Sequence, residues 1–219
     1  MGCRERALAV PSTSLQRFSD QNGVAGNTQY VKDLTLLYLI RHCQTSGQDA
    51  DAPLTPLGFE QADVLAAFLA ERGVRRIVSS THLRARQSVE PLAVRLGLPV
   101  ETDVRLIERV LSTAVLSDWR ERLLDTWADF DLTLPGGESS RAATTRGLAA
   151  LDDALAAAHL PVAVVAHGNL ISLLLHALDG RPGHQTWERL TNPDVFLIEP
   201  RPVSSRLPRG WPITRLWPA

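Results

Sequence analysis

Two short apolar runs constrain the fold of this chain more than any other feature of its sequence. Residues 34–40 (LTLLYLI) and 162–166 (VAVVA) are almost entirely apolar, and basic or histidine side chains follow each run: Arg41 and His42 after the first, His167 after the second. An unbroken apolar run of this length is typical of a strand buried on both faces, as in a parallel sheet. Such a sheet needs helices on both of its sides, so the two runs favour an α/β fold.

Helical patterns separate the predicted strands. Thr55 and Pro56 mark the start of one helix and Gly73 its end, while Gly97 ends the helix after it. The remaining patterns predict strands over residues 76–78, 100–104, 195–199 and 213–217, and helices over 116–130, 138–158 and 170–178. Strands that alternate with helices predict right-handed βαβ units, and therefore a three-layer α/β/α sandwich with a mostly parallel central sheet.

The domain organisation follows from the same patterns. Residues 1–33 are rich in polar residues and show no period of 2 or 3.6, so they are predicted to form a flexible N-terminal extension. Residues 34–219 are predicted to form a single domain, with a small helical insertion around 112–135. A domain of this length can bury a substantial core without disulfides or metals.

Composition excludes several functional classes. A net charge of −1 argues against a nucleic-acid binder, which needs a basic face. The longest apolar stretch, Leu160–Leu178, is interrupted by polar residues and so predicts no membrane span, and the N-terminus has no apolar core suited to a signal peptide. Two cysteines cannot form a disulfide framework. We therefore expect a cytoplasmic protein whose oligomeric state stays open, a homodimer included.

Four basic or histidine side chains are expected to converge at one edge of the sheet. Arg41 and His42 end the first strand, Arg84 lies just inside the helix after the second, and His167 ends the strand over 162–166. Ligands of open α/β sheets bind beyond the carboxyl ends of the strands. Guanidinium groups bind phosphoryl oxygens and imidazole can attack phosphorus, so a small phosphorylated substrate is the natural ligand. The helix beginning near Asn169 adds the N–H groups of its first turn.

These positions lie in motifs that resemble those of the histidine phosphatase superfamily, the phosphoglycerate mutase-like proteins, and its phosphatase branch in particular. Arg41-His42-Cys43-Gln44-Thr45 resembles the family's Arg-His-Gly-x-Thr signature. The resemblance continues, in chain order, through Leu54–Ala62 (LTPLGFEQA), Ser79–Ser88 (SSTHLRARQS), Gly136–Ser139 (GGES) and Val165–Asn169 (VAHGN).

The resemblance implies a two-step reaction and a role for each matching residue. His42 is the expected nucleophile, which forms a phosphohistidine, and Arg41, Arg84 and His167 are expected to bind the oxygens of the transferred group. Glu108, in a segment similar to the family's Arg-Leu-x-Glu, is the expected general acid. Glu138 is the alternative acid, although its place after two glycines suits a helix start better.

Substrate contacts are expected from Thr45, Gln48, Gly168 and Asn169. Gln48 stands where many family members carry an asparagine, which leaves the substrate class open. Cys43 replaces the signature glycine, so redox control of His42 is an open alternative. No cofactor and no metal is predicted, because the histidines lack a short ligand spacing. His82 and His184 are predicted to be exposed.

Three functions remain possible for such a site. The leading one is a metal-independent phosphomonoesterase, and the alternatives are a phosphoglycerate-type mutase and a non-catalytic module that binds phosphorylated ligands. Eleven residues separate His42 from Leu54, and Glu108 precedes Gly137 by 29 positions. The glycolytic mutases carry longer insertions in both places, so the short segments favour hydrolysis over transfer.

Overall fold

The computed structural model describes residues 36–156, 159–201 and 208–217, which belong to one compact unit, Asp33–Ala219. The prediction of a flexible extension over residues 1–33 lies outside the described residues.

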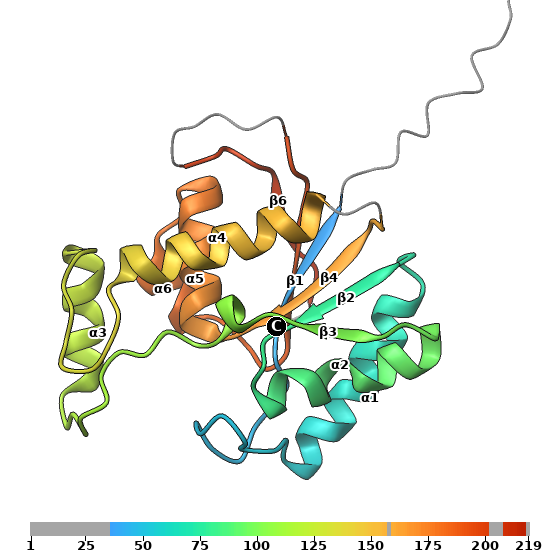
Figure 1. Ribbon diagram of the computed structural model, residues 1–219, viewed down its shortest axis with the longest axis horizontal. Helices are drawn as coiled ribbons and strands as arrows, with labels where there is room; N and C mark the ends of the chain where they lie inside the picture. Colours follow the sequence, from blue (N-terminus) through green and yellow to red (C-terminus); the bar gives the residue numbers. More distant parts are fainter. Residues whose placement is uncertain (1–35, 157–158, 202–207, 218–219) are drawn as a thin grey trace, which may run out of the picture. The chain divides into compact units, whose positions relative to one another are not determined.

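The described residues form one six-stranded sheet with the order β3-β2-β4-β1-β5-β6 (Figure 1). Strands β1, β4, β2 and β3 are parallel to one another, whereas β5 is antiparallel to both of its neighbours, β1 and β6. The predicted mostly parallel sheet is therefore confirmed. The strands are β1 (Leu37–Arg41), β2 (Arg76–Ser79), β3 (Val100–Thr102), β4 (Val162–Ala166), β5 (Asp194–Ile198) and β6 (Ile213–Arg215).

Helices cover both faces of the sheet, as a strand buried on both sides requires. Leu37 and Leu39 of β1 pack in the core beneath α4 (Ser140–Ala156) and α5 (Gly168–Asp179), while Tyr38 and Ile40 pack in the core beneath α1 (Pro56–Ala70) and α2 (Leu83–Leu96). Successive side chains of a strand point to opposite faces, so one apolar run supplies both cores. The two helix pairs lie on opposite sides of the strands in Figure 1, which gives the predicted three-layer sandwich.

Two predicted helix boundaries, at Thr55 and Gly97, are confirmed, whereas α1 ends at Ala70, before the predicted Gly73. The Thr55 side chain accepts a hydrogen bond from the backbone N–H of Gly58 and so caps α1, and Gly97 ends α2 with a left-handed φ of 65°. The third strand is shorter than predicted and ends at Thr102, because the Asp103 carboxylate accepts from the backbone N–H of Arg105 and starts a 3₁₀ turn over Val104–Leu106.

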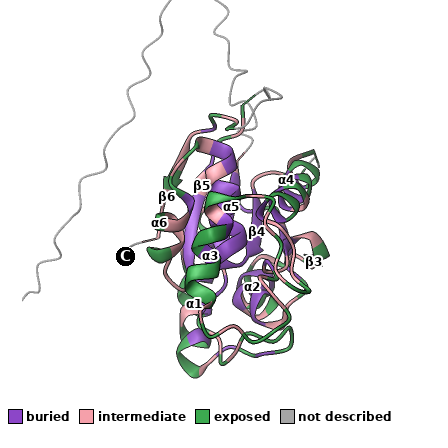
Figure 2. Ribbon diagram, turned by 90° about the vertical axis from the view of Figure 1, so that its left-hand side faces the viewer, coloured by how far each residue is buried: buried purple, intermediate pink, exposed green. Residues whose placement is uncertain are grey.

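Two further helices lie beside the sheet rather than on it. Helix α3 (Trp119–Ala128) forms the regular part of the predicted insertion and is mostly exposed (Figure 2). Helix α6 (Gly183–Glu188) was not predicted, because six residues are too few to show a helical period. The Trp127 ring of α3 lies so close to Gly183 that a Cβ at that position would come within 2.0 Å of it.

Among the described helices, none combines the length and the apolar character that crossing a bilayer requires.

Gly58 is predicted to be essential for the packing of α1 against the loop after β1. A Cβ at Gly58 would lie 2.1 Å from the backbone oxygen of Gln44, so a Gly58→Ala variant must displace that loop. We expect the free energy of unfolding in urea to fall by about 1–3 kcal/mol. The matched control is Glu60→Ala on the exposed side of α1, which should stay within about 0.5 kcal/mol of the parent. Equal stability of the two variants would contradict this packing.

Candidate active site

His42 directly follows β1 and is held in one orientation. Its ring Nδ1 lies 2.7 Å from the backbone oxygen of Cys43, and because a carbonyl oxygen only accepts, Nδ1 carries the proton of the neutral ring. The lone pair then resides on Nε2. The side chain is only 6% exposed, and this burial, together with the charges of Arg84 and Arg41, lowers the pKa of His42 to about 3. The ring is therefore neutral, and potentially nucleophilic, at neutral pH.

His167 follows β4 and lies beside His42, with 5.0 Å between the ring centroids. The parallel register pairs Arg41 with Ala166, so the residues after these two strands must be neighbours. His167 is fully buried, and its Nε2 lies 2.7 Å from the Ser80 hydroxyl oxygen. Burial, followed by the charges of neighbouring groups, lowers the pKa of His167 well below its usual value.

His82 is a site residue that sequence reasoning missed, and the prediction that it is exposed was wrong. It is partly buried, and its ring packs edge-on against that of His167 with 4.8 Å between centroids. Ser80 was also missed. Both residues lie in the short segment between β2 and Arg84. Their place directly after a strand end was the sequence signal that could have identified them as site residues.

Arg41 extends from the last position of β1 across the start of α5. Its Nη1 donates to the backbone oxygen of Leu190 at 2.9 Å. Gly168 makes this path possible, because a Cβ at that position would come within 3.2 Å of the guanidinium group. Gly168, in the turn after His167, therefore leaves room for the Arg41 guanidinium group.

Arg84 is 1% exposed and holds the loop after β1. Its Nη1 donates to the backbone oxygens of Gln48 at 3.1 Å and Asp49 at 2.7 Å. The Arg84 Nε has no hydrogen-bond partner among the described residues. The guanidinium group thus positions the loop and retains an unpaired N–H for an anion.

Glu108 lies at the N-terminus of α5. Its Oε1 accepts from the backbone N–H of Leu170 at 3.0 Å and its Oε2 from that of Asn169 at 3.1 Å. A third bond comes from the backbone N–H of Arg109, at 2.9 Å. The carboxylate therefore occupies N–H groups that we expected to face phosphate, and the positive end of the helix stabilises it.

Asn169 contributes a buried amide to the same place. The side chain is 7% exposed, and neither its Oδ1 nor its Nδ2 has a partner in the part of the chain that the structure describes. An unpaired buried amide is costly unless a ligand or water satisfies it. This favours the predicted role of Asn169 in binding substrate through its side chain.

Thr45 and Gln48 lie in the loop after β1. The Thr45 hydroxyl is 3.1 Å from the backbone oxygens of both Gly47 and Pro53, so its hydrogen stays within the loop. The Gln48 side chain lines a cavity together with Arg41 and Glu108. Of these two candidates, only Gln48 is therefore placed to face a ligand.

Cys43 and Glu138 are both engaged in the protein structure. The Cys43 thiol is fully buried, and that burial raises its pKa to about 12, which disfavours the thiolate needed for redox control. The Glu138 carboxylate forms an ion pair with Arg146 of α4. Glu108, not Glu138, is therefore the carboxylate beside Arg41.

Two cavities adjoin this cluster. The inner cavity, of about 470 Å³, is lined by Arg41, Glu108 and Asn169 together with Trp119 and Leu123 of α3 and Trp187 of α6. The outer cavity, of about 720 Å³, shares Arg41 and Trp187 with the inner one and lies between α3 and α6.

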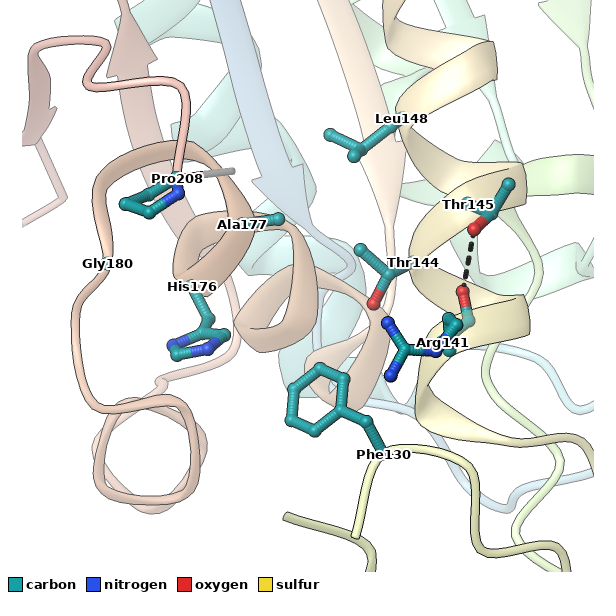
Figure 3. Close-up of a pocket in the computed structure, with 9 residues that line it drawn as sticks. All are labelled: Phe130, Arg141, Thr144, Thr145, Leu148, His176, Ala177, Gly180 and Pro208. Carbon is teal, nitrogen blue, oxygen red and sulfur yellow. Dashed lines mark hydrogen bonds between the residues drawn. The ribbon is translucent and has the colours of Figure 1, made fainter. Parts of the chain in front are cut away.

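A third cavity, of about 400 Å³, lies between α4 and α5 and shares none of its lining residues with the other two (Figure 3). Its polar side chains bond within the protein. Thr145 donates to the backbone oxygen of Arg141, and the Arg141 side chain pairs with Asp131.

Comparisons with known proteins agree with this geometry. Residues 37–207 match the model of the histidine phosphatase superfamily, branch 1. A protein of Yersinia pestis (strain Pestoides F), named probable phosphoglycerate mutase GpmB, is 32% identical over 202 residues, covering 81% of this chain and 90% of that protein.

Solved structures of phosphatases are similar as well. Mycobacterial glucosyl-3-phosphoglycerate phosphatase, in complex with inorganic phosphate, is 28% identical with a TM-score of 0.65, covering 84% of this chain and 97% of that one. The alpha-ribazole phosphatase of Shigella flexneri, at 23% identity and a TM-score of 0.61, covers 83% and 95% of the two chains and shares the fold.

The lowered pKa of His42 predicts that its ring does not titrate between pH 8 and pH 5. NMR of histidine-labelled protein, with the signal assigned through a His42→Ala variant, measures this. The same signal in the urea-unfolded chain should titrate near 6.5. Because only the unfolded chain then binds this proton, the free energy of unfolding should fall as the pH drops from about 6.5 towards 3, by at most about 1.4 kcal/mol per pH unit from this group. Titration of the folded ring near 6.5 would contradict the assignment.

Proposed function

The chain belongs to the histidine phosphatase superfamily, and we propose that it is a phosphomonoesterase that hydrolyses a small phosphorylated metabolite through a phosphohistidine on His42. The observation that carries the proposal is the neutral, oriented ring of His42 beside His167, Arg41 and Arg84, with Glu108 in the adjoining cavity. This set supplies a nucleophile, anion-binding groups and an acid.

In the first step, the Nε2 lone pair of His42 attacks phosphorus. A nitrogen–phosphorus bond forms and the bond from phosphorus to the ester oxygen breaks. Arg41, Arg84 and His167 bind the oxygens of the transferred group as the two bonds exchange. Glu108, in its protonated form, gives its proton to the departing alcohol oxygen. Oε2 accepts a single backbone bond, so it retains a lone pair that can carry this proton.

In the second step, water attacks the phosphohistidine. The Glu108 carboxylate accepts the proton of the water as its oxygen bonds to phosphorus, and the nitrogen–phosphorus bond breaks. Inorganic phosphate and neutral His42 result, and Glu108 is again protonated for the next cycle. We propose that no metal takes part, because the two guanidinium groups supply the positive charge that a metal would otherwise provide.

A phosphoglycerate-type mutase is the second candidate, and the relative from Yersinia pestis favours it. The short segments after His42 and after Glu108 favour hydrolysis, as do the phosphatases among the similar structures. A non-catalytic binding module is less well supported, because such a module needs neither the nucleophile nor the acid.

The His42→Ala variant is expected to lose hydrolysis of p-nitrophenyl phosphate in buffer that contains EDTA. The matched control is His159→Ala, which removes an exposed histidine near the end of α4 and should retain full activity. Trapping with a labelled phosphoester should place acid-labile, base-stable label on wild-type enzyme and none on His42→Ala. Full activity of His42→Ala would refute the nucleophile assignment.

A separate assay distinguishes hydrolysis from transfer. Incubation with 3-phosphoglycerate that yields 2-phosphoglycerate without free phosphate would establish the mutase instead.

The Glu108→Gln variant tests the acid. We expect a drop of about 10²–10⁴-fold in kcat/KM for an alkyl phosphate, whose leaving group needs a proton. The drop should be much smaller for p-nitrophenyl phosphate, whose phenolate leaves without one. Glu138→Gln is the control and should affect both substrates equally. If Glu108→Gln also affects both equally, Glu108 is a structural cap of α5 and the acid lies elsewhere.

A further inference from the structure

The proposed phosphatase leaves open which alcohol carries the phosphate, and the walls of the inner cavity bear on that question. The walls of this cavity include Leu111, Trp119 and Leu123, in and beside the insertion, and Trp187 of α6. The two indole rings meet edge to face, with 6.0 Å between their centroids. These four side chains give the cavity an apolar, aromatic wall.

Trp119 keeps an unusual amount of apolar surface free at this wall. It is 41% exposed, despite its contact with Trp187. Trp127, about two helical turns along α3, instead packs closely against Gly183 and Phe130 and lies against the core. A ligand that covers a large exposed aromatic surface at a cavity gains binding free energy from the apolar area it removes from water.

The charged groups that line the inner cavity are Arg41, Arg109 and Glu108. Arg109 is 5% exposed, and it donates to the Thr126 hydroxyl and to the backbone oxygen of Glu138, while its Nη2 is buried without a partner among the described residues. Glu108 is protonated in the proposed first step. These groups therefore do not exclude a carboxylate on the alcohol, and the aromatic wall is the feature that narrows the substrate.

The outer cavity is lined by charges of both signs. Arg120 lies against the Trp119 ring, but the carboxylates of Glu121 and Glu188 line the same space. His184 lies 3.7 Å from Glu188. Positive and negative groups therefore balance there, and nothing in the lining selects a negatively charged substrate tail.

We propose that the alcohol of the substrate carries a flat apolar face that binds against Trp119 and Trp187. This inference rests on the proposed phosphatase activity and narrows its substrate class.

Benzyl phosphate and 3-phosphoglycerate provide the test, because both release an alkoxide and so differ mainly in the group that the cavity must bind. Wild-type enzyme should show at least about tenfold higher kcat/KM for benzyl phosphate. Trp119→Ala and Trp187→Ala should each lower kcat/KM for benzyl phosphate about tenfold or more. Their kcat/KM for glycerol 3-phosphate, which has no flat face, should change less than about threefold. Trp119→Phe should recover most of the loss.

The control variant is Val115→Ala, in the same insertion but fully exposed and outside both cavities, which should behave as wild type. Calorimetry with benzylphosphonate, which the enzyme cannot hydrolyse, measures binding to the same site. The affinity should weaken about tenfold in Trp119→Ala. A preference for 3-phosphoglycerate, or equal losses on all substrates in both tryptophan variants, overturns the inference while hydrolysis through His42 stands. Absence of hydrolysis with intact benzylphosphonate binding would instead refute the phosphatase and leave the binding preference in place.

Discussion

The pairing of β1 with β4 is the interaction on which the site depends. The two strands are parallel and in register from Leu37 with Val162 to Arg41 with Ala166, and the backbone N–H of His42 extends the pairing by donating to Ala166. Two imidazoles separated by more than a hundred residues therefore leave the sheet side by side. A slip of one residue would turn every side chain of β1 to the opposite face, so the burial of both faces fixes the position of the histidines.

Burial and charge act together on the two rings. A histidine among guanidinium groups loses affinity for a proton, and desolvation adds to the effect, which is why the pKa values of His42 and His167 both fall. The pocket can then be cationic and nucleophilic at once, because the arginines hold the charge and the imidazoles stay neutral. Lysines in place of the arginines would lose the planar arrangement of donors that fits phosphoryl oxygens.

Much of this arrangement could be predicted from local sequence signals. The apolar runs, the Thr55 cap and the Gly97 terminus are each determined by a few neighbouring residues, and the runs placed the ends of β1, β2 and β4 to within one residue. The placement of Glu108 on the N–H groups of Asn169 and Leu170 could not be derived this way, since it depends on the path of a segment outside the sheet. His82 was missed because a single histidine in a polar segment carries no period that reveals burial.

The insertion and α6 show how such a site acquires selectivity without any change to its chemistry. The proposed catalytic groups come from the ends of β1 and β4, from the start of α2 and, for Glu108, from the segment after the 3₁₀ turn. Trp119 and Trp187 come from two short helices beside the sheet, held together by close packing of Trp127 on Gly183. The nature of the alcohol can therefore change through residues of α3 and α6, while the phosphoryl group meets the same histidines and arginines. On the proposed function, the sheet positions the histidines, and the two side helices line the space for the alcohol.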